Sequence, residues 1–231
     1  MPSSIWIHSP RATARAAGLF YLVIIICGIG AEALIRGSLV VPGDPVATTD
    51  NIAGAELLFR LSILADVVMA LSDVALAILL YALLRPVHHL LALLATAFRL
   101  VQAAILGINV LHLWEAAALA GGTSTSPVRD ELVLAGVEAH AAGYDFALFF
   151  FGINCILVAV LLLRSMAVPR MLAALISAAG LVYLAGATTR VVAPALVDWV
   201  APAYLIPVVA ELGFCGWLIV KGLEDRRPAS R

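Results

Sequence analysis

The chain has few charged residues, and this scarcity excludes several classes of protein. Only 13% of its 231 residues are Asp, Glu, Lys or Arg, and the 14 Lys and Arg residues are spread along the chain. A nucleic-acid-binding protein needs a basic patch or stripe, so the sequence argues against that partner. A His-Glu-x-x-His zinc motif, a Gly-x-Ser-x-Gly nucleophile motif and a glycine-rich phosphate loop are also absent from the sequence.

Cysteine is scarce as well. Cys27, Cys155 and Cys215 all fall inside apolar runs, and an odd number of such residues predicts neither a disulfide framework nor metal ligands. We interpret them as small apolar residues. The sequence identifies no cofactor and no catalytic residue, and whether the protein is an enzyme stays open.

Long hydrophobic runs are what the chain has in abundance. Hydrophobic residues make up 63% of it and the mean hydropathy is +1.06, whereas soluble domains are about 45–50% apolar. Apolar windows of about 20 residues are long enough to cross a bilayer. They predict an all-α fold, a polytopic transmembrane helix bundle of about six spans. The predicted spans are 14–36, 57–84, 90–116, 138–164, 168–190 and 201–221.

These spans leave little chain for anything else. We expect a cytoplasmic N-terminal segment at 1–13, a single transmembrane domain at 14–222 and a charged cytoplasmic tail at 223–231. The first span also imitates a signal peptide, because basic residues precede its apolar run and small residues follow it. Its length favours a retained helix.

Lys and Arg are distributed unevenly between the loops on the two sides of the predicted spans. Nine lie on the side of the termini and three on the opposite side. Because cytoplasmic loops carry the excess of Lys and Arg, both termini are expected in the cytoplasm. The expected location is a cell membrane, which the chain crosses several times. The nine are Arg11, Arg15, Arg85, Arg164, Arg170, Lys221, Arg226, Arg227 and Arg231; the three are Arg36, Arg129 and Arg190; Arg60 and Arg99 lie at or within the membrane.

Three ionisable residues fall near the middle of predicted spans. At a rise of about 1.5 Å per residue, Asp73 lies about 16 Å from the cytoplasmic end of its helix, and Arg99 and Glu211 lie about 14 Å from theirs. A lone charge at that depth is costly, so we expect Arg99 to pair with Asp73, with Glu211, or with both. Gln102 follows Arg99 by three residues and shares its helix face.

These four residues are the candidate ligand-binding or proton-relay site. With two acids for one arginine, one carboxyl is expected to hold its proton. The alternative is a static clamp that joins three helices.

A second polar set lies nearer the predicted outer surface. Asn109 continues the polar stripe of the third span, and Glu32, Asp66 and His112 are further secondary candidates. No tight ligand motif accompanies them, so no metal site is predicted. The set also contains Glu115, His140 and Asp145.

Much of the chain, from about Arg11 to Gly222, resembles a family of membrane proteins grouped as domain of unknown function 4386. The resemblance implies a multi-pass, largely bacterial membrane protein of about this length, and with it the cytoplasmic membrane of a bacterium as the expected location. Because the family has no established activity, it assigns no role to any residue. The stretches that carry it are AGLFYLVIIICGIGAEALIRGSLVVPGDPVATTDNI, LFRLSILADVVMALSDVALAILLYALLRPV, AFRLVQAAILGINVL, YDFALFFFGINCILVAVLLLRS, VPRMLAALISAAGLVYL and AELGFCGWLIVKG.

Three classes of function remain open. The first is an intramembrane protein that binds or modifies a lipophilic small molecule at the midplane site, and a pocket near Asp73 and Arg99 would favour it. The second is a small proton- or cation-coupled transporter, which needs a path to both faces. The third is a structural or partner-binding membrane subunit, whose polar groups should pair completely. The expected partners are membrane lipids, a lipophilic small molecule and a second copy of the chain, and not nucleic acid.

Overall fold

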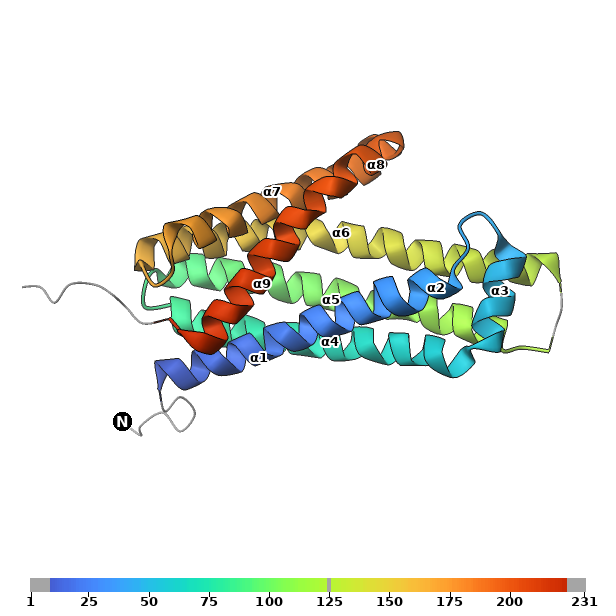
Figure 1. Ribbon diagram of the computed structural model, residues 1–231, viewed down its shortest axis with the longest axis horizontal. Helices are drawn as coiled ribbons and strands as arrows, with labels where there is room; N and C mark the ends of the chain where they lie inside the picture. The colour runs from blue at the N-terminus through green and yellow to red at the C-terminus, as the bar shows by residue number, and fades with distance from the viewer. Residues whose placement is uncertain (1–8, 124–125, 224–231) are drawn as a thin grey trace, which may run out of the picture. The chain divides into compact units, whose positions relative to one another are not determined.

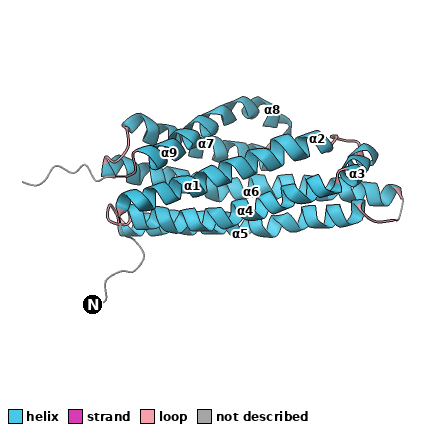
Figure 2. Ribbon diagram, turned by 60° about the horizontal axis from the view of Figure 1, so that its bottom comes forward, coloured by secondary structure: helices cyan, strands magenta, loops and turns pink. Residues whose placement is uncertain are grey.

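A computed structural model describes residues 9–123 and 126–223 of the chain. Within these residues the chain forms helices, turns and loops and no strand (Figure 2). Six helices are long and apolar enough to cross a membrane, which confirms the all-α fold class and the number of spans. Most of the predicted N-terminal segment and nearly all of the predicted charged tail lie outside the described residues. The six helices are Pro10–Leu39, Glu56–Leu84, His89–Ala120, Pro127–Ser165, Arg170–Val192 and Ala201–Val220.

The first long helix has three parts. The α-helix α1 (Pro10–Ile29) runs into a π-helical segment, η1 (Gly30–Arg36), and then into the short α2 (Gly37–Leu39). Its start is set by Ser9, whose hydroxyl accepts a hydrogen bond from the Ala12 amide at 3.1 Å, with proline in the first turn. The π-helical segment was not predicted, because apolar periodicity does not register one extra residue in a turn.

A short helix that the span prediction did not contain follows. In α3 (Pro45–Gly54) the Asp44 carboxylate caps the Ala47 amide at 2.9 Å, and Pro45 occupies the first helical position. Residues 45–54 are too polar and too few to cross a membrane, so a hydropathy window passes over them.

The remaining helices follow the predicted spans. α4 (Glu56–Leu84) and α5 (His89–Ala120) are joined by a short turn. α6 (Pro127–Ser165) starts well before residue 138, where the predicted span began, because a hydropathy window passes over the charged first turns of this helix. Two long helices, α7 (Arg170–Val192) and α9 (Leu205–Val220), follow, with the short helix α8 (Val197–Val200) between them. The 3₁₀ turns η2 (Pro194–Leu196) and η3 (Ala201–Tyr204) flank α8 (Figure 1).

The chain divides into two compact units, and several helices contribute to both. Unit 1 consists of Met1–Leu22, Ser72–Gln102 and Leu148–Arg231. Unit 2 consists of Val23–Leu71 and Ala103–Ala147. Unit 1 therefore contains part of all six long helices, whereas unit 2 contains parts of four of them together with α3.

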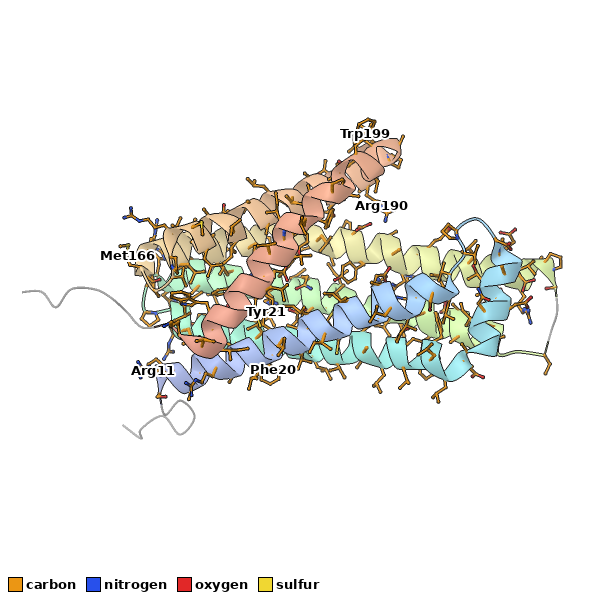
Figure 3. The ribbon with its side chains drawn as sticks, in the orientation of Figure 1. Arg11, Phe20, Tyr21, Met166, Arg190 and Trp199 are labelled. Carbon is orange, nitrogen blue, oxygen red and sulfur yellow. The ribbon has the colours of Figure 1, made fainter. Side chains whose placement is uncertain are left out.

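Unit 1 is held together by close helix contacts. The helices α7 and α9 lie side by side (Figure 1). α9 also lies against α1, where the Tyr21 and Phe214 rings meet edge to face at 6.1 Å and the Cys215 thiol donates to the Gly18 carbonyl at 3.4 Å. Figure 3 shows Tyr21 at this crossing and Phe20 on the outer side of the helix. Small residues permit such close approach between membrane helices.

Unit 2 has its own apolar core. The helix α3 places Ile52 against Phe59 of α4, Leu113 of α5 and Val133 of α6, and all four side chains are fully buried. Burial of such side chains is the main favourable contribution to packing when water is the alternative. In the hydrocarbon of a bilayer, close van der Waals contact takes over that role.

The outward faces of both units carry large apolar side chains. Leu57, Leu71 and Ile108 in unit 2 are exposed, as are Leu93 and Leu181 in unit 1. Acyl chains are the surroundings that such surfaces fit. This agrees with helices that cross a membrane.

Candidate functional site: a buried polar cluster in unit 1

An ion pair between α4 and α5 forms the centre of the cluster. Arg99 Nη2 donates to Asp73 Oδ1 at 2.5 Å, and the two side chains are 3% and 2% exposed. The sequence prediction that Arg99 pairs with Asp73 is therefore confirmed. Because both charges are removed from water, removing one partner would leave the other buried without compensation.

Gln102 joins this pair, as its position on the face of Arg99 indicated. Its amide nitrogen donates to Asp73 Oδ2 at 3.3 Å, so both carboxylate oxygens have partners. The pairing is incomplete on the α5 side. Arg99 Nε and Gln102 Oε1 are buried and have no hydrogen-bond partner among the described residues. Buried polar atoms without partners are rare and call for an explanation such as water or a ligand.

Two aromatic rings enclose the guanidinium group. The Arg99 Cζ atom lies 5.4 Å from the centre of the Tyr21 ring and 5.0 Å from that of Phe151. Both distances allow cation–π attraction, which gains strength where water is excluded. The rings come from α1 and α6, so four helices position this one arginine.

Glu211 lies in the same unit but has different partners. It accepts a short hydrogen bond from the Tyr183 hydroxyl, and the Tyr21 hydroxyl is a second partner. Within the described residues the ion pair of Arg99 is with Asp73, so of the alternatives that the sequence left open the structure has the pairing with Asp73. The Glu211 carboxylate still lies close enough to Arg99 and Asp73 for their charges to interact. Tyr21 thus touches both the Arg99 side and the Glu211 side of the cluster.

A small cavity adjoins the cluster between α4, α5 and α6. Its volume is about 10 Å³, which is the room that one water molecule requires. Most of its wall is apolar, with Ala77, Leu80 and Ala92 among the lining residues, whereas Arg99 and Asn154 contribute polar groups. The Asn154 amide is held in place because it donates to the Ala95 carbonyl at 2.8 Å.

A second buried polar cluster lies in unit 2. Arg36 Nη1 donates to Asp66 Oδ2 at 2.8 Å, and Arg36 Nη2 donates to Asp66 Oδ1 at 3.3 Å. His140 Nε2 lies 3.3 Å from Asp66 Oδ2, and Arg36 also pairs with Glu32 at 2.8 Å. Arg36, Asp66 and His140 are buried, whereas Glu32 is 64% exposed.

The secondary candidates are therefore not all brought together. Asp66 and Glu32 meet through Arg36. Asn109 is buried and donates to the His140 backbone carbonyl at 2.7 Å, which makes it a helix-to-helix contact. His112 is exposed on α5 and takes no part in these contacts. Within the described residues no three His, Cys, Asp or Glu side chains gather in a group suited to a metal ion.

Sequence reasoning missed several members of these clusters. Tyr21, Phe151 and Tyr183 stand in apolar runs that contain many aromatic residues, so their types alone gave no signal. Arg36 was assigned to an outer loop, but it is buried at the end of the π-helical segment η1. The signal that could have found it is the position of Arg36 one helical turn after Glu32, at the end of the apolar run of the first span.

The fold and the two clusters define a class of protein: an integral, multi-pass helical membrane protein with charged groups in its interior. Membrane helices rarely carry such groups unless they pair with one another or serve a function. The chain belongs to the family described as domain of unknown function (DUF4386), which matches residues 16–222. The resemblance noted in the sequence is thereby confirmed. No curated protein and no solved structure matches the chain.

Proposed function

We propose that the Asp73–Arg99 cluster of unit 1 binds a lipophilic small molecule through its polar end. The supporting observation is the small cavity that adjoins Arg99, together with the two buried polar atoms that have no partner. Arg99 Nε offers a donor and Gln102 Oε1 offers an acceptor. A ligand group that carries an acceptor and a donor, such as a carboxylic acid, a hydroxyl or an amide, matches this pair.

The volume of the cavity limits how such a ligand fits. About 10 Å³ holds one water molecule and no organic group. The polar end of a ligand must therefore replace that water, and apolar side chains such as Leu80 and Leu84 must move aside. The exchange of their contacts with an apolar ligand costs little, because in hydrocarbon surroundings one apolar contact replaces another.

The acids of unit 1 give the site a chemical capacity beyond binding. Asp73 is held by Arg99 and Gln102, whereas Glu211 is held by tyrosine hydroxyls. The first carboxyl is therefore paired with a cation, whereas the second is held by neutral hydroxyl groups. Proton transfer to a bound molecule is the reaction that these groups would support if the protein is an enzyme.

A second candidate function is proton- or cation-coupled transport. The observation that favours it is the Tyr183–Glu211–Tyr21 arrangement beside Arg99, which links three helices through groups that can carry protons. A structural or partner-binding subunit is the third. It is less favoured because its polar groups should pair completely, and Arg99 Nε and Gln102 Oε1 do not.

Native mass spectrometry of the gently purified protein tests the binding proposal. We expect a stoichiometric lipophilic molecule on the unaltered chain and its loss from Arg99→Gln. Arg60→Gln serves as the matched control, because Arg60 also follows phenylalanine but forms an exposed pair with Glu56. Leu80→Phe, which fills the cavity without altering a charge, should also lose the ligand.

The outcomes separate the candidates. Equal retention of the ligand in Arg99→Gln, Leu80→Phe and Arg60→Gln would contradict binding at this cluster. An unaltered chain that carries no molecule would contradict tight binding. Proton flux in vesicles that disappears with Glu211→Gln would then support transport.

A further inference from the structure

The residues that line the cavity beside Arg99 extend to the end of α4 and the start of α5. They include Leu84, the last residue of α4, and Ala92 in the first turn of α5. Arg99 follows the first residue of α5 by ten residues, which is about 15 Å along the helix. The lining therefore connects the Asp73–Arg99 cluster with the α4–α5 turn, at the end of unit 1 where α1 starts (Figure 1).

Tyr81 belongs both to the cavity lining and to a contact at this turn. Its hydroxyl lies 3.0 Å from Nε2 of His89, the first residue of α5, which is a hydrogen-bond distance. The two rings also meet edge to face, with their centroids 6.0 Å apart. The start of α5 is held in place by His88, whose Nδ1 accepts a hydrogen bond from the Leu91 amide at 3.2 Å. The Tyr81–His89 contact thus joins the two helices where the cavity lining ends.

The polar groups in the lining suit a water molecule. The Thr96 hydroxyl donates to the Ala92 carbonyl at 2.8 Å, and a hydroxyl that donates can still accept. Asn154 donates one amide hydrogen to the Ala95 carbonyl, and a side-chain amide carries a second N–H and an acceptor oxygen. A buried water molecule needs about two to four polar partners. Thr96, Asn154 and Arg99 are three such residues in the lining.

The proposed binding function requires water to leave this cavity, because the polar end of the ligand takes its place. Hydrocarbon offers that water no hydrogen bonds, so the surrounding bilayer is a poor exit. We propose that water exchanges singly between the cavity and the α4–α5 turn, and that the Tyr81–His89 contact is the gate of this route. The inference rests on the proposed binding at Arg99. The route opens on the side predicted to be cytoplasmic.

Hydroxyl-radical labelling of the full chain in lipid nanodiscs tests the route. X-ray pulses generate the radicals from water, and mass spectrometry locates the oxidised side chains. We expect oxidation of Leu80, which is buried but lines the cavity, and only background oxidation of Leu162, which is buried in α6 and is not a lining residue. Tyr81→Phe removes only the hydroxyl and should raise the oxidation of Leu80 about five-fold, the factor that one ordinary hydrogen bond supports.

Matched variants at the turn separate the gate from a general loosening. His89→Leu removes the partner of Tyr81 and should act like Tyr81→Phe. His89→Gln keeps a group that can bond to the hydroxyl and should stay close to the unaltered chain. His88→Asn removes the neighbouring imidazole but keeps a side chain that caps a helix, so it should leave the oxidation of Leu80 unchanged.

Each other result overturns a part of the inference. Leu80 that stays unoxidised in every variant would overturn the water route. Equal oxidation of Leu80 in the unaltered chain, Tyr81→Phe and His89→Leu would overturn the gate, as would a parallel rise at Leu162. The labelling needs no bound ligand. A chain that carries no molecule in native mass spectrometry, yet shows gated oxidation of Leu80, would therefore contradict the binding proposal alone.

Discussion

At the scale of single residues, the dominant feature is charge that is buried and paired. Arg99 with Asp73 in unit 1 and Arg36 with Asp66 in unit 2 are both nearly inaccessible. A buried pair contributes little net stability compared with an apolar pair of the same size, yet breaking it is costly. The two buried pairs are therefore weak evidence for a stable fold, although each becomes a liability when one partner is removed.

This asymmetry gives the first stability prediction. Arg99→Leu should lower the free energy of unfolding by about 3–5 kcal/mol, because it strands the Asp73 carboxylate. Asp73→Leu/Arg99→Leu should be more stable than the single variant, because no charge is left unpaired. Thermal unfolding in detergent measures both.

Arg60→Leu is the control for these two variants. Arg60 and Glu56 are 43% and 47% exposed, and an exposed pair contributes at most about 1 kcal/mol. A double variant as unstable as Arg99→Leu would contradict the pairing argument. So would an Arg60→Leu variant that loses as much stability as Arg99→Leu.

At the scale of helices, glycines set how closely neighbours approach. An added Cβ at Gly152 of α6 would lie 2.8 Å from the Gly180 carbonyl oxygen of α7, and one at Gly180 would lie 2.6 Å from the Gly152 oxygen. Each contact is with backbone, which cannot rotate away. These two glycines therefore fix the α6–α7 crossing in unit 1.

Gly180→Ala should destabilise the protein by about 1–3 kcal/mol, the usual cost of an overpacked contact. Gly216→Ala is the matched control, since Gly216 lies in α9 of the same unit and a Cβ there meets nothing within 4 Å. Alanine should be neutral or favourable there, because it forms helix more readily than glycine. Equal melting shifts for the two variants would show that backbone approach at the crossing is not limiting.

The helices also show what a sequence can and cannot predict. Apolar windows located all six spans, and charges within them marked Asp73 and Arg99, because an ionisable group stands out against hydrocarbon. Gln102 was found by its spacing of three residues from Arg99. The window missed α3, whose ten residues are polar, and it missed the inward turn of Arg36, which depends on one π-helical turn. Glu211 was found, but its tyrosine partners were not, because tyrosine is unremarkable in an apolar run.

At the scale of the whole molecule, the distribution of positive charge predicts orientation. Loops on one side hold nine Lys and Arg residues and loops on the other hold three. Among those that the structure describes, Arg36 is buried and not exposed in a loop. An even number of spans, six, predicts that both termini lie on the same side.

Labelling of one added cysteine at a time tests this orientation. Pro86→Cys in the α4–α5 turn should resist a membrane-impermeant maleimide in intact cells and react in inside-out vesicles. Thr123→Cys in the α5–α6 loop should show the opposite behaviour. The unaltered chain gives the background, because Cys155 and Cys215 are buried and Cys27 is partly buried. Labelling of Thr123→Cys only from the cytoplasmic side would show that the chain has the opposite orientation in the membrane. That result would contradict the charge argument, because the loops richer in Lys and Arg would then lie outside the cytoplasm.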